Sequence, residues 1–313
     1  MAAKEKGNAK TSNKTLKGQM AEANSSPCEK TKGRNAIANS SPCEKTKPHD
    51  ARPGSSSSAG NQKLKIGFFS LTCCEGCGFA VLDLEEKLLR AFELIEIVES
   101  RVLMEKPRPS AIKLDVAFVE GSVVTKHDLD KLMEIRQKAS FLVALGACAT
   151  IAGINGIRAS LPKEMNEMLK RNALRPVKEK AFPLSAFVPV DFMLQGCPIN
   201  EQEFLDFLNK FLHGVKPRLD DTPVCFECKL RENDCLLLKG IPCLGPASYA
   251  GCNALCPSLN AQCIGCRGFT GDANFSSLDS IFKEIGLTKK QRFNLFTYFN
   301  QLPEPLEGLK EEQ

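Results

Sequence analysis

Residues 65–78 read KIGFFSLTCCEGCG, and this stretch decides the fold. Its first seven residues are a short, mostly apolar run of the kind that forms a buried strand. Cys74 and Cys77 follow as a C-x-x-C pair, and a helical pattern begins after them. The apolar side chains of that pattern share one helix face, at Val81, Leu84, Leu88 and Leu89. A buried strand that runs through a loop into a helix is the first unit of an α/β fold.

The alternation of strand and helix continues along the chain. Apolar runs predict further strands at 94–98, 114–119 and 141–145, and a weaker one at 186–190, which contains Pro189. Helices are predicted over residues 201–211 and through Leu129, Leu132 and Ile135. Strands that alternate with helices indicate a parallel, doubly wound sheet.

Cysteines follow three of these strands. Cys74 and Cys77 come after the first strand, Cys148 after the fourth and Cys197 just beyond the fifth. In open parallel sheets the loops at the carboxyl ends of the strands line one crevice, so we expect the four thiols to meet there. Structural zinc usually takes regularly spaced ligands, whereas 70 and 48 residues separate the later cysteines here. The pattern favours an iron–sulfur cluster over zinc, and the lack of G-x-G-x-x-G or a P-loop lysine in the first loop disfavours a nucleotide.

Eight more cysteines lie between residues 225 and 266. They supply enough thiolate for two four-cysteine sites and are Cys225, Cys228, Cys235, Cys243, Cys252, Cys256, Cys263 and Cys266. The residues between them are mostly glycine, proline and small side chains, with too few apolar groups for a core of their own. Such a segment needs cross-links to hold its shape. Two iron–sulfur clusters and paired zinc sites both fit the spacing, and disulfides are a less favoured third interpretation.

Amino-acid composition and charge indicate in which compartment the protein works and which partners are excluded. The 313 residues are enough for two ordinary domains, and they include fifteen cysteines but no export signal and no apolar run of bilayer length. We therefore expect a cytoplasmic protein, without a membrane partner, whose cysteines serve metal or redox chemistry. The net charge is +5, but residues 1–62 carry eleven Lys or Arg and five Asp or Glu, so the remainder sums to −1. No basic excess is left for binding nucleic acid.

The first 62 residues have a different character. They are rich in Lys, Ser, Asn and Gly and poor in aromatic side chains, which predicts a disordered basic tail. The segment 23–32 recurs at 38–47 and gives Cys28 and Cys43 the same Ser-Pro-Cys-Glu setting. Two copies are too few for a solenoid, so a duplicated disordered segment is favoured over a shared metal site.

The motifs together resemble a known family. A resemblance to the small subunit of nickel–iron hydrogenases rests on the strand with C-x-x-C and on Val119-Glu120-Gly121-Ser122, Gly146-Ala147-Cys148 and Gly196-Cys197-Pro198. The related subunit of respiratory complex I shares this first domain. The second half favours the hydrogenases through Cys243-Leu244-Gly245-Pro246, Gly251-Cys252 and Cys263-Ile264-Gly265-Cys266-Arg267-Gly268. Over roughly residues 63–300, the chain looks most like the delta subunit of cytoplasmic NAD(P)-linked enzymes, also called sulfhydrogenases.

Residue by residue, the resemblance implies three 4Fe–4S clusters. A proximal cluster, beside the nickel–iron centre of a large subunit, takes Cys74, Cys77, Cys148 and Cys197. A distal cluster takes Cys225, Cys228, Cys235 and Cys243. A medial cluster takes Cys252, Cys256, Cys263 and Cys266, and the cysteine at 256 makes it a four-iron rather than a three-iron cluster. Crossed ligation between the last two sites, as in ferredoxins, stays open.

The resemblance also implies partners and a domain plan. Residues 63–215 are expected to form a flavodoxin-like domain with the proximal cluster, and residues 216–313 an iron–sulfur domain with two clusters and C-terminal helices. The chain is expected to be the non-catalytic, electron-transfer subunit of a hydrogenase. It relays electrons between the H2-activating large subunit and flavin/iron–sulfur subunits that bind NAD(P). Two alternatives stay open: the small subunit of a hydrogenase that feeds a heterodisulfide reductase, and a zinc-stapled interaction protein.

Five residues near these motifs are assigned no ligand role. Cys73 is expected to be a buried thiol beside the proximal site, and Glu75 a solvated loop carboxylate. Lys229, Arg231 and Arg267 are expected as charges around the distal loop that either steer an electron-accepting partner or simply face solvent.

Overall fold

The computed structural model describes residues 63–87, 93–102, 104, 112–156, 181–218, 221–299 and 304–309. The predictions of a disordered tail over 1–62 and of a repeat that contains Cys28 and Cys43 lie outside the described residues. So do the helical positions Leu88 and Leu89.

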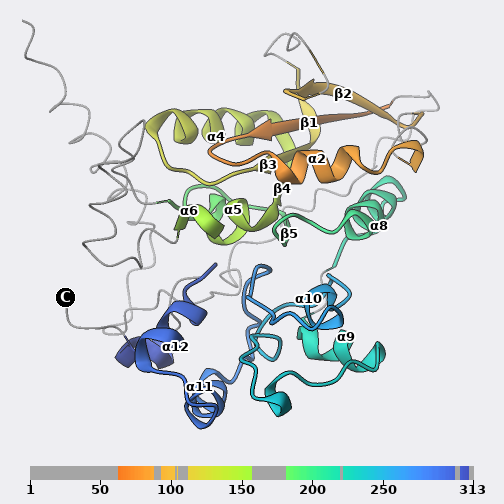
Figure 1. The fold of residues 1–313 in the computed structure, drawn as a ribbon. Coiled ribbons are helices and arrows are strands. Elements are labelled where there is room, and N and C mark those ends of the chain that lie inside the picture. Colours follow the sequence, from red (N-terminus) through yellow and green to blue (C-terminus); the bar gives the residue numbers. More distant parts are fainter. Residues whose placement is uncertain are drawn as a thin grey trace, which may run out of the picture.

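Five parallel strands form the predicted doubly wound sheet (Figure 1). They are β1 (Leu64–Ser70), β2 (Ile95–Ser100), β3 (Leu114–Glu120), β4 (Ala139–Leu145) and β5 (Phe192–Leu194). Their order is β2-β1-β3-β4-β5, and all neighbouring pairs are parallel. This is the flavodoxin-like order, whose topological switch point lies between β1 and β3. The prediction of fold class is therefore confirmed.

Strand β5 begins later in the chain than predicted. The sequence predicts a strand at 186–190. The structure instead has a 3₁₀ helix, η2 (Leu184–Ala186), and the strand begins only at Phe192. Pro189 has no N–H to give to a ladder, which explains why pairing does not begin there. Instead, Asp191 N–H donates to the Leu142 carbonyl at 2.9 Å, and the Asp191 carboxylate accepts from Leu142 N–H at 2.7 Å. Pairing with β4 starts only at this residue.

Helices cover both faces of the sheet. On one face, α2 (Gly76–Leu82) and α8 (Glu201–Leu212) bury Val81, Phe204 and Phe207. On the other, α4 (Lys126–Lys138) buries the three apolar residues that the sequence predicts, Leu129, Leu132 and Ile135. The short helices α5 (Gly146–Ile151) and α6 (Gly153–Gly156) follow β4 directly.

Stacked aromatic rings hold α8 on the sheet. The Phe118 ring on β3 lies 5.0 Å from the Phe68 ring and 5.2 Å from the Phe204 ring, measured between centroids. Phe207 stacks on Phe192 of β5 at 4.9 Å. Aromatic pairs at these separations contribute beyond the area they bury. The first turn of α8, which begins at Glu201, is thereby packed on the sheet; the sheet and its helices, residues 63–215, are here called the first unit.

The second unit follows α8 and lies below the sheet in Figure 1. It contains α9 (Val224–Leu230), η3 (Leu237–Lys239), α10 (Leu255–Ser258), α11 (Phe275–Glu284), α12 (Lys289–Phe296) and η4 (Glu304–Leu309). Its main core is built around Phe269, Phe282 and Phe296. From residues 225–266 this core takes only Leu244 and Ala247 among its buried members. The cysteine stretch thus packs on a core that the later helices provide.

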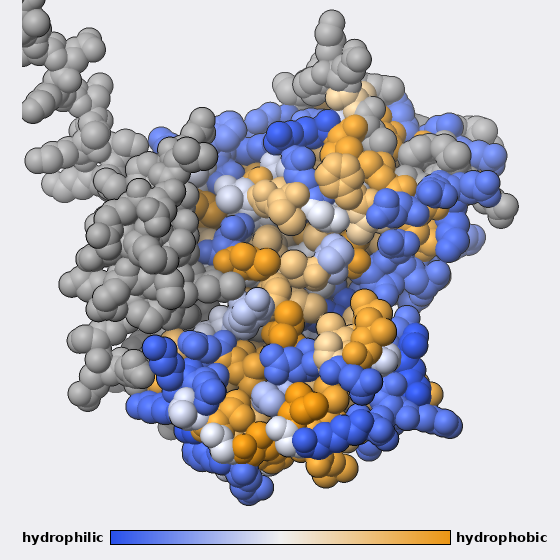
Figure 2. Space-filling view, in the orientation of Figure 1, coloured by the Kyte–Doolittle hydropathy of each residue, from blue (hydrophilic) through white to orange (hydrophobic). Residues whose placement is uncertain are grey.

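The surface differs between the outer edges and the centre of the molecule. On the face shown in Figure 2, polar side chains cover the edges, and apolar surface gathers around α5 and β5, where the first unit meets the second. Within the described ranges, no helix combines the length and the apolar character needed to cross a bilayer.

Candidate functional site

The four cysteines of the predicted proximal site come together at the carboxyl ends of the strands. Cys74 precedes α2, Cys77 lies in its first turn, Cys148 lies in α5 and Cys197 follows β5. Ala147 N–H donates to the Gly196 carbonyl at 2.7 Å, which joins the loops of Cys148 and Cys197. These cysteines, here called group A, therefore converge from three loops.

The thiols of group A influence one another's ionisation. Burial, followed by the charges of Glu120, Cys197 and Cys148, raises the pKa of Cys77 to about 12. Burial, followed by Cys197 and Cys74, raises the pKa of Cys148 to about 11. Thiolates packed this closely repel one another, so they need a positive centre among them before all four can ionise. The donor set and its electrostatics fit a metal cluster.

Cys73 and Glu75 flank group A. Burial, followed by the charge of Glu120, raises the pKa of Cys73 to about 12, although the thiol is only half-buried. Glu75 forms an ion pair with Arg101 at 3.2 Å. The Arg101 side chain is largely exposed, so the pair contributes little to stability. Glu75 is thus ion-paired rather than simply solvated as the sequence analysis expects.

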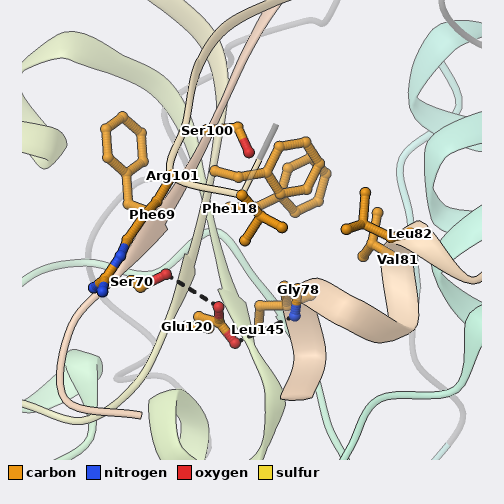
Figure 3. Close-up of a pocket in the computed structure, with 12 residues that line it drawn as sticks. Phe69, Ser70, Gly78, Val81, Leu82, Ser100, Arg101, Phe118, Glu120 and Leu145 are labelled. Carbon is orange, nitrogen blue, oxygen red and sulfur yellow. Dashed lines mark hydrogen bonds between the residues drawn. The ribbon is translucent and has the colours of Figure 1, made fainter. Parts of the chain in front are cut away.

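Glu120 is a residue of the site that sequence reasoning misses. It ends β3, is 5% exposed, and accepts hydrogen bonds from Ser70 Oγ at 3.1 Å and Gly78 N–H at 3.3 Å (Figure 3). Burial raises the pKa of its carboxyl group. Beside it lies a cavity of about 20 Å³ that Val81 also lines, roughly the space of one water. The available signal was a carboxylate at the end of a mostly apolar strand.

A second set of four, here called group B, surrounds α9. Cys225 and Cys228 lie one helical turn apart on α9, and Cys235 and Cys243 follow in the chain. Burial raises the pKa of Cys225 to about 11, with further contributions from the thiols of Cys243, Cys228 and Cys235. A Cβ atom added to Gly245 would lie 3.4 Å from Cys243 Sγ and 3.5 Å from Cys225 Sγ. Because Cys235 is exposed, group B reaches the surface.

The remaining cysteines form a third set, here called group C: Cys252, Cys256, Cys263 and Cys266. Burial, followed by the thiols of Cys252 and Cys256, raises the pKa of Cys266 to about 11. Cys263 has neighbours in two groups, because burial and then the thiols of Cys243 and Cys266 raise its pKa to about 12. Its N–H lies 3.4 Å from Cys243 Sγ. Groups B and C are therefore adjacent, and crossed ligation stays open.

Group C also adjoins group A. Cys266 lies beside Cys197, because the Cys197 backbone lowers the pKa of the Cys266 thiol and the charge of the Cys197 thiol raises it. The order in space is consequently A, C, B, although the order along the chain is A, B, C. Within the part of the chain that the structure describes, no three His, Cys, Asp or Glu side chains gather closely enough for a single metal ion. The alternative of structural zinc stays a prediction to test.

The expectation for Arg267 is wrong. Lys229 and Arg231 are exposed at the end of α9, as predicted, but Arg267 is only 3% exposed. Its Nη2 donates to both carboxylate oxygens of Glu203, at 2.8 and 2.9 Å. A guanidinium can be buried when its donors are satisfied in this way, and nothing in the local pattern indicated an acidic partner 64 residues earlier.

Several known proteins are similar to this chain in sequence. The family model described as NADH ubiquinone oxidoreductase, 20 Kd subunit, matches residues 74–211. The chain is 42% identical over 224 residues to sulfhydrogenase 2 subunit delta of Pyrococcus furiosus, covering 71% of this chain and 93% of the relative. It is 31% identical to a subunit of the F420-non-reducing hydrogenase vhu of Methanocaldococcus jannaschii, covering 66% of this chain and 82% of the relative.

Among solved structures, a chain of an NAD+-reducing [NiFe]-hydrogenase in the H2-reduced state is 27% identical, with a TM-score of 0.45. The match covers 51% of this chain and 96% of that one. The identity to the Pyrococcus furiosus subunit extends over nearly the whole of that relative, well beyond the segment that the family model matches. The chain therefore belongs to the family of nickel–iron hydrogenase small subunits.

Proposed function

We propose that this chain carries electrons through three 4Fe–4S clusters in a hydrogenase complex. The clusters would lie between an H2-activating large subunit and a flavin/iron–sulfur partner that binds NAD(P). The observation that carries the proposal is the arrangement of twelve cysteines in three adjoining groups of four. Group A adjoins group C through Cys197 and Cys266, and group C adjoins group B through Cys263 and Cys243.

Each group offers the donor set of one cluster. Four cysteine thiolates are the usual ligands of a 4Fe–4S cluster, which takes up and releases single electrons when it is bound. Group A would hold the proximal cluster, group C the medial one and group B the distal one. Gly146 supports the assignment of group A, because a Cβ atom there would lie 2.3 Å from Cys77 Sγ and displace that thiol. Residues 63–215 and 216–313 would form the corresponding domains.

The large subunit is proposed to dock at group A. Cys74 is exposed there, and the nearby side chains of Phe79 on α2 and Ile154 on α6 are each about half-exposed. Exposed apolar surface beside a functional group is typical of an interface. The apolar region in the middle of Figure 2 supports the same face.

Electrons are proposed to leave from group B. Cys235 is exposed, and it lies in the chain between two apolar side chains that protrude into solvent, Leu230 and Leu238. Lys229 and Arg231 lie beside Glu232 and Asp234 at the end of α9, so the exposed surface there carries charges of both signs. This surface suits a partner that accepts electrons from the distal cluster.

The acceptor is proposed to be an NAD(P)-binding partner, because the identity to a sulfhydrogenase delta subunit, 42%, exceeds the 31% to the subunit of an F420-non-reducing hydrogenase. The latter similarity keeps a second candidate, a hydrogenase that feeds a heterodisulfide reductase.

Anaerobic co-purification tests both candidates. We expect a nickel-containing large subunit, a flavin subunit that binds NAD(P), and about twelve iron and twelve sulfide per copy of this chain. Heterodisulfide-reductase subunits in place of the flavin subunit would support the second candidate. Stoichiometric zinc without iron would refute both and favour the zinc-stapled interaction protein.

A further inference from the structure

We infer that Arg267 and Glu203 form a clamp that presses group C against group A and thereby fixes the spacing between the proximal and medial clusters. The inference rests on the proposed function, since it concerns the path of electrons between two of its clusters. Arg267 is a positioning residue in this scheme, because its guanidinium donates to Glu203, Gln195 and Ala250 and not to a cysteine.

One guanidinium joins the loops of both groups. Besides its two bonds to Glu203, Arg267 donates through Nη1 to the Gln195 carbonyl at 2.6 Å and through Nε to the Ala250 carbonyl at 2.6 Å. Gln195 stands two residues before Cys197 of group A. Ala250 stands two residues before Cys252 of group C, and Arg267 itself follows Cys266. The clamp therefore reaches the backbone beside ligands of both groups.

The two sides of the clamp have different supports. Glu203 lies in the first turn of α8, where its own N–H donates to the capping side chain of Asn200 at 3.1 Å. The next residue, Phe204, is packed in the core of the first unit. Arg267 comes from the second unit, at the end of the cysteine stretch. The ion pair thus ties the well-packed core of the first unit to a loop whose shape depends on its cysteines.

The surrounding chain closes tightly over the clamp. Gly251, at φ +109°, is so near that a Cβ atom there would lie 2.3 Å from Arg267 Nη2 and 2.8 Å from Glu203 Oε1. Gly251 N–H and Ala254 N–H donate to the Glu227 carboxylate at 2.8 and 2.9 Å, which fixes the loop that carries Cys252. Such packing leaves Arg267 no freedom to serve as a surface charge for a partner.

Loss of the clamp has a specific expected effect. Each group keeps its four thiols, so clusters still assemble, but the contact of Cys266 with the Cys197 backbone is no longer enforced. Electron exchange between two centres weakens steeply as they separate. Transfer from the proximal to the medial cluster is then slowed, whereas the chemistry on the large subunit, which precedes it, is not.

The test uses the whole complex, purified anaerobically, with Arg267→Lys and Glu203→Gln. Arg267→Lys keeps the positive charge but cannot make the forked set of bonds, and Glu203→Gln keeps the shape but removes the anion. Lys283→Gln is the matched control, because it removes one ion pair of Asp279 on α11, outside the cysteine stretch, while Asp279 keeps its bond to Arg292. Four quantities are measured: iron content, hydrogen–deuterium exchange activity, H2-driven dye reduction, and the magnetic coupling between reduced clusters by electron paramagnetic resonance.

We expect both clamp variants to keep their iron and their exchange activity. Their H2-driven dye reduction should fall severalfold, and the coupling signal between clusters should weaken. If rate and coupling both match those of Lys283→Gln, Arg267 does not set the spacing. If a clamp variant loses iron, the residues maintain the sites themselves, and the positioning role is equally refuted. Failure of the proposed function is recognised separately, because the unsubstituted complex would then lack iron or H2-dependent activity.

Discussion

Replacing Gly146 with alanine tests whether group A needs the close approach that the structure shows. Gly146 begins α5 at φ +84°, a left-handed conformation that costs a residue with a side chain about 1–2 kcal/mol. The added Cβ atom would also lie 2.3 Å from Cys77 Sγ and 3.4 Å from the Gly196 carbonyl oxygen. Ordinary contact requires roughly 3.5 Å, so the thiol or the loop must move by about 1 Å.

The two costs can be separated with a control. Gly240 has φ +73°, and a Cβ atom there would meet no atom within 4 Å. Gly240→Ala should therefore lose only the backbone term, about 1–2 kcal/mol of unfolding free energy. Gly146→Ala should lose this and a further overpacking term of about 1–3 kcal/mol. It should also lose the proximal cluster, because Cys77 cannot keep its place.

The assay is iron and sulfide content of both variants after anaerobic purification, followed by denaturant unfolding. We expect Gly240→Ala to keep the full cluster content and Gly146→Ala to lose about four iron, the content of one cluster. Equal iron content in the two variants would refute the reasoning, since it would mean that Cys77 is not needed where the structure places it.

Further predictions concern cysteines of groups A and B and the tail. Cys148→Ala should impair cluster assembly, subunit association and all H2-dependent activity together. Cys235→Ala should keep hydrogen–deuterium exchange but lose most H2-driven NAD(P) reduction. Normal NAD(P) reduction by the Cys235 variant would show that electrons do not leave through group B. In metal-free protein, the raised pKa of Cys77 means little thiolate at pH 8, so mass spectrometry should find its alkylation slower than that of the exposed Cys235, and equal rates would contradict the burial. Because that pKa lies above the ordinary value of 9.0, the associated stability is present below pH 9 and should be lost as the pH rises toward 12, as denaturant unfolding of the metal-free protein can show. Removal of residues 1–60 should leave cluster content and H2-dependent dye reduction unchanged, and a loss of iron would give the repeated segment a function.

Buried parallel strands are the part of the fold that sequence predicts well. Such strands are covered on both faces, so they appear as continuous apolar runs, as at Phe141 to Leu145. The position of strand β5 was predicted wrongly, because the strand has only three residues and the nearest apolar run contains Pro189. Its displacement left Cys197 unaffected, since the loop that carries this cysteine still follows the strand.

Polar residues of the site were harder to predict because their partners are distant in the chain. The predicted topology brought the cysteines of group A together, and the resemblance implied the division into groups B and C, but nothing local distinguished Arg267 from the exposed Lys229. A charged residue in a loop is usually solvated, and only the fold brings Glu203 to it. Glu120 was missed for the same reason, because its hydrogen bonds come from Ser70, 50 residues earlier, and from Gly78 on another element.

The path of the chain through the second unit explains why the clamp stands where it does. After α8 the chain first runs away from group A and builds group B around α9, then turns back through group C and ends the stretch at Cys266, beside Cys197. Packing alone fixes the position of this returning segment only weakly, because residues 225–266 contribute few side chains to the main core. A thiol must also lose its proton before it binds iron, so the shape of this segment is coupled to metal loading. Arg267 is the first residue beyond the last thiol, and its bonds to Glu203 and Gln195 fix the returning chain to the first unit by contacts that involve no metal ligand.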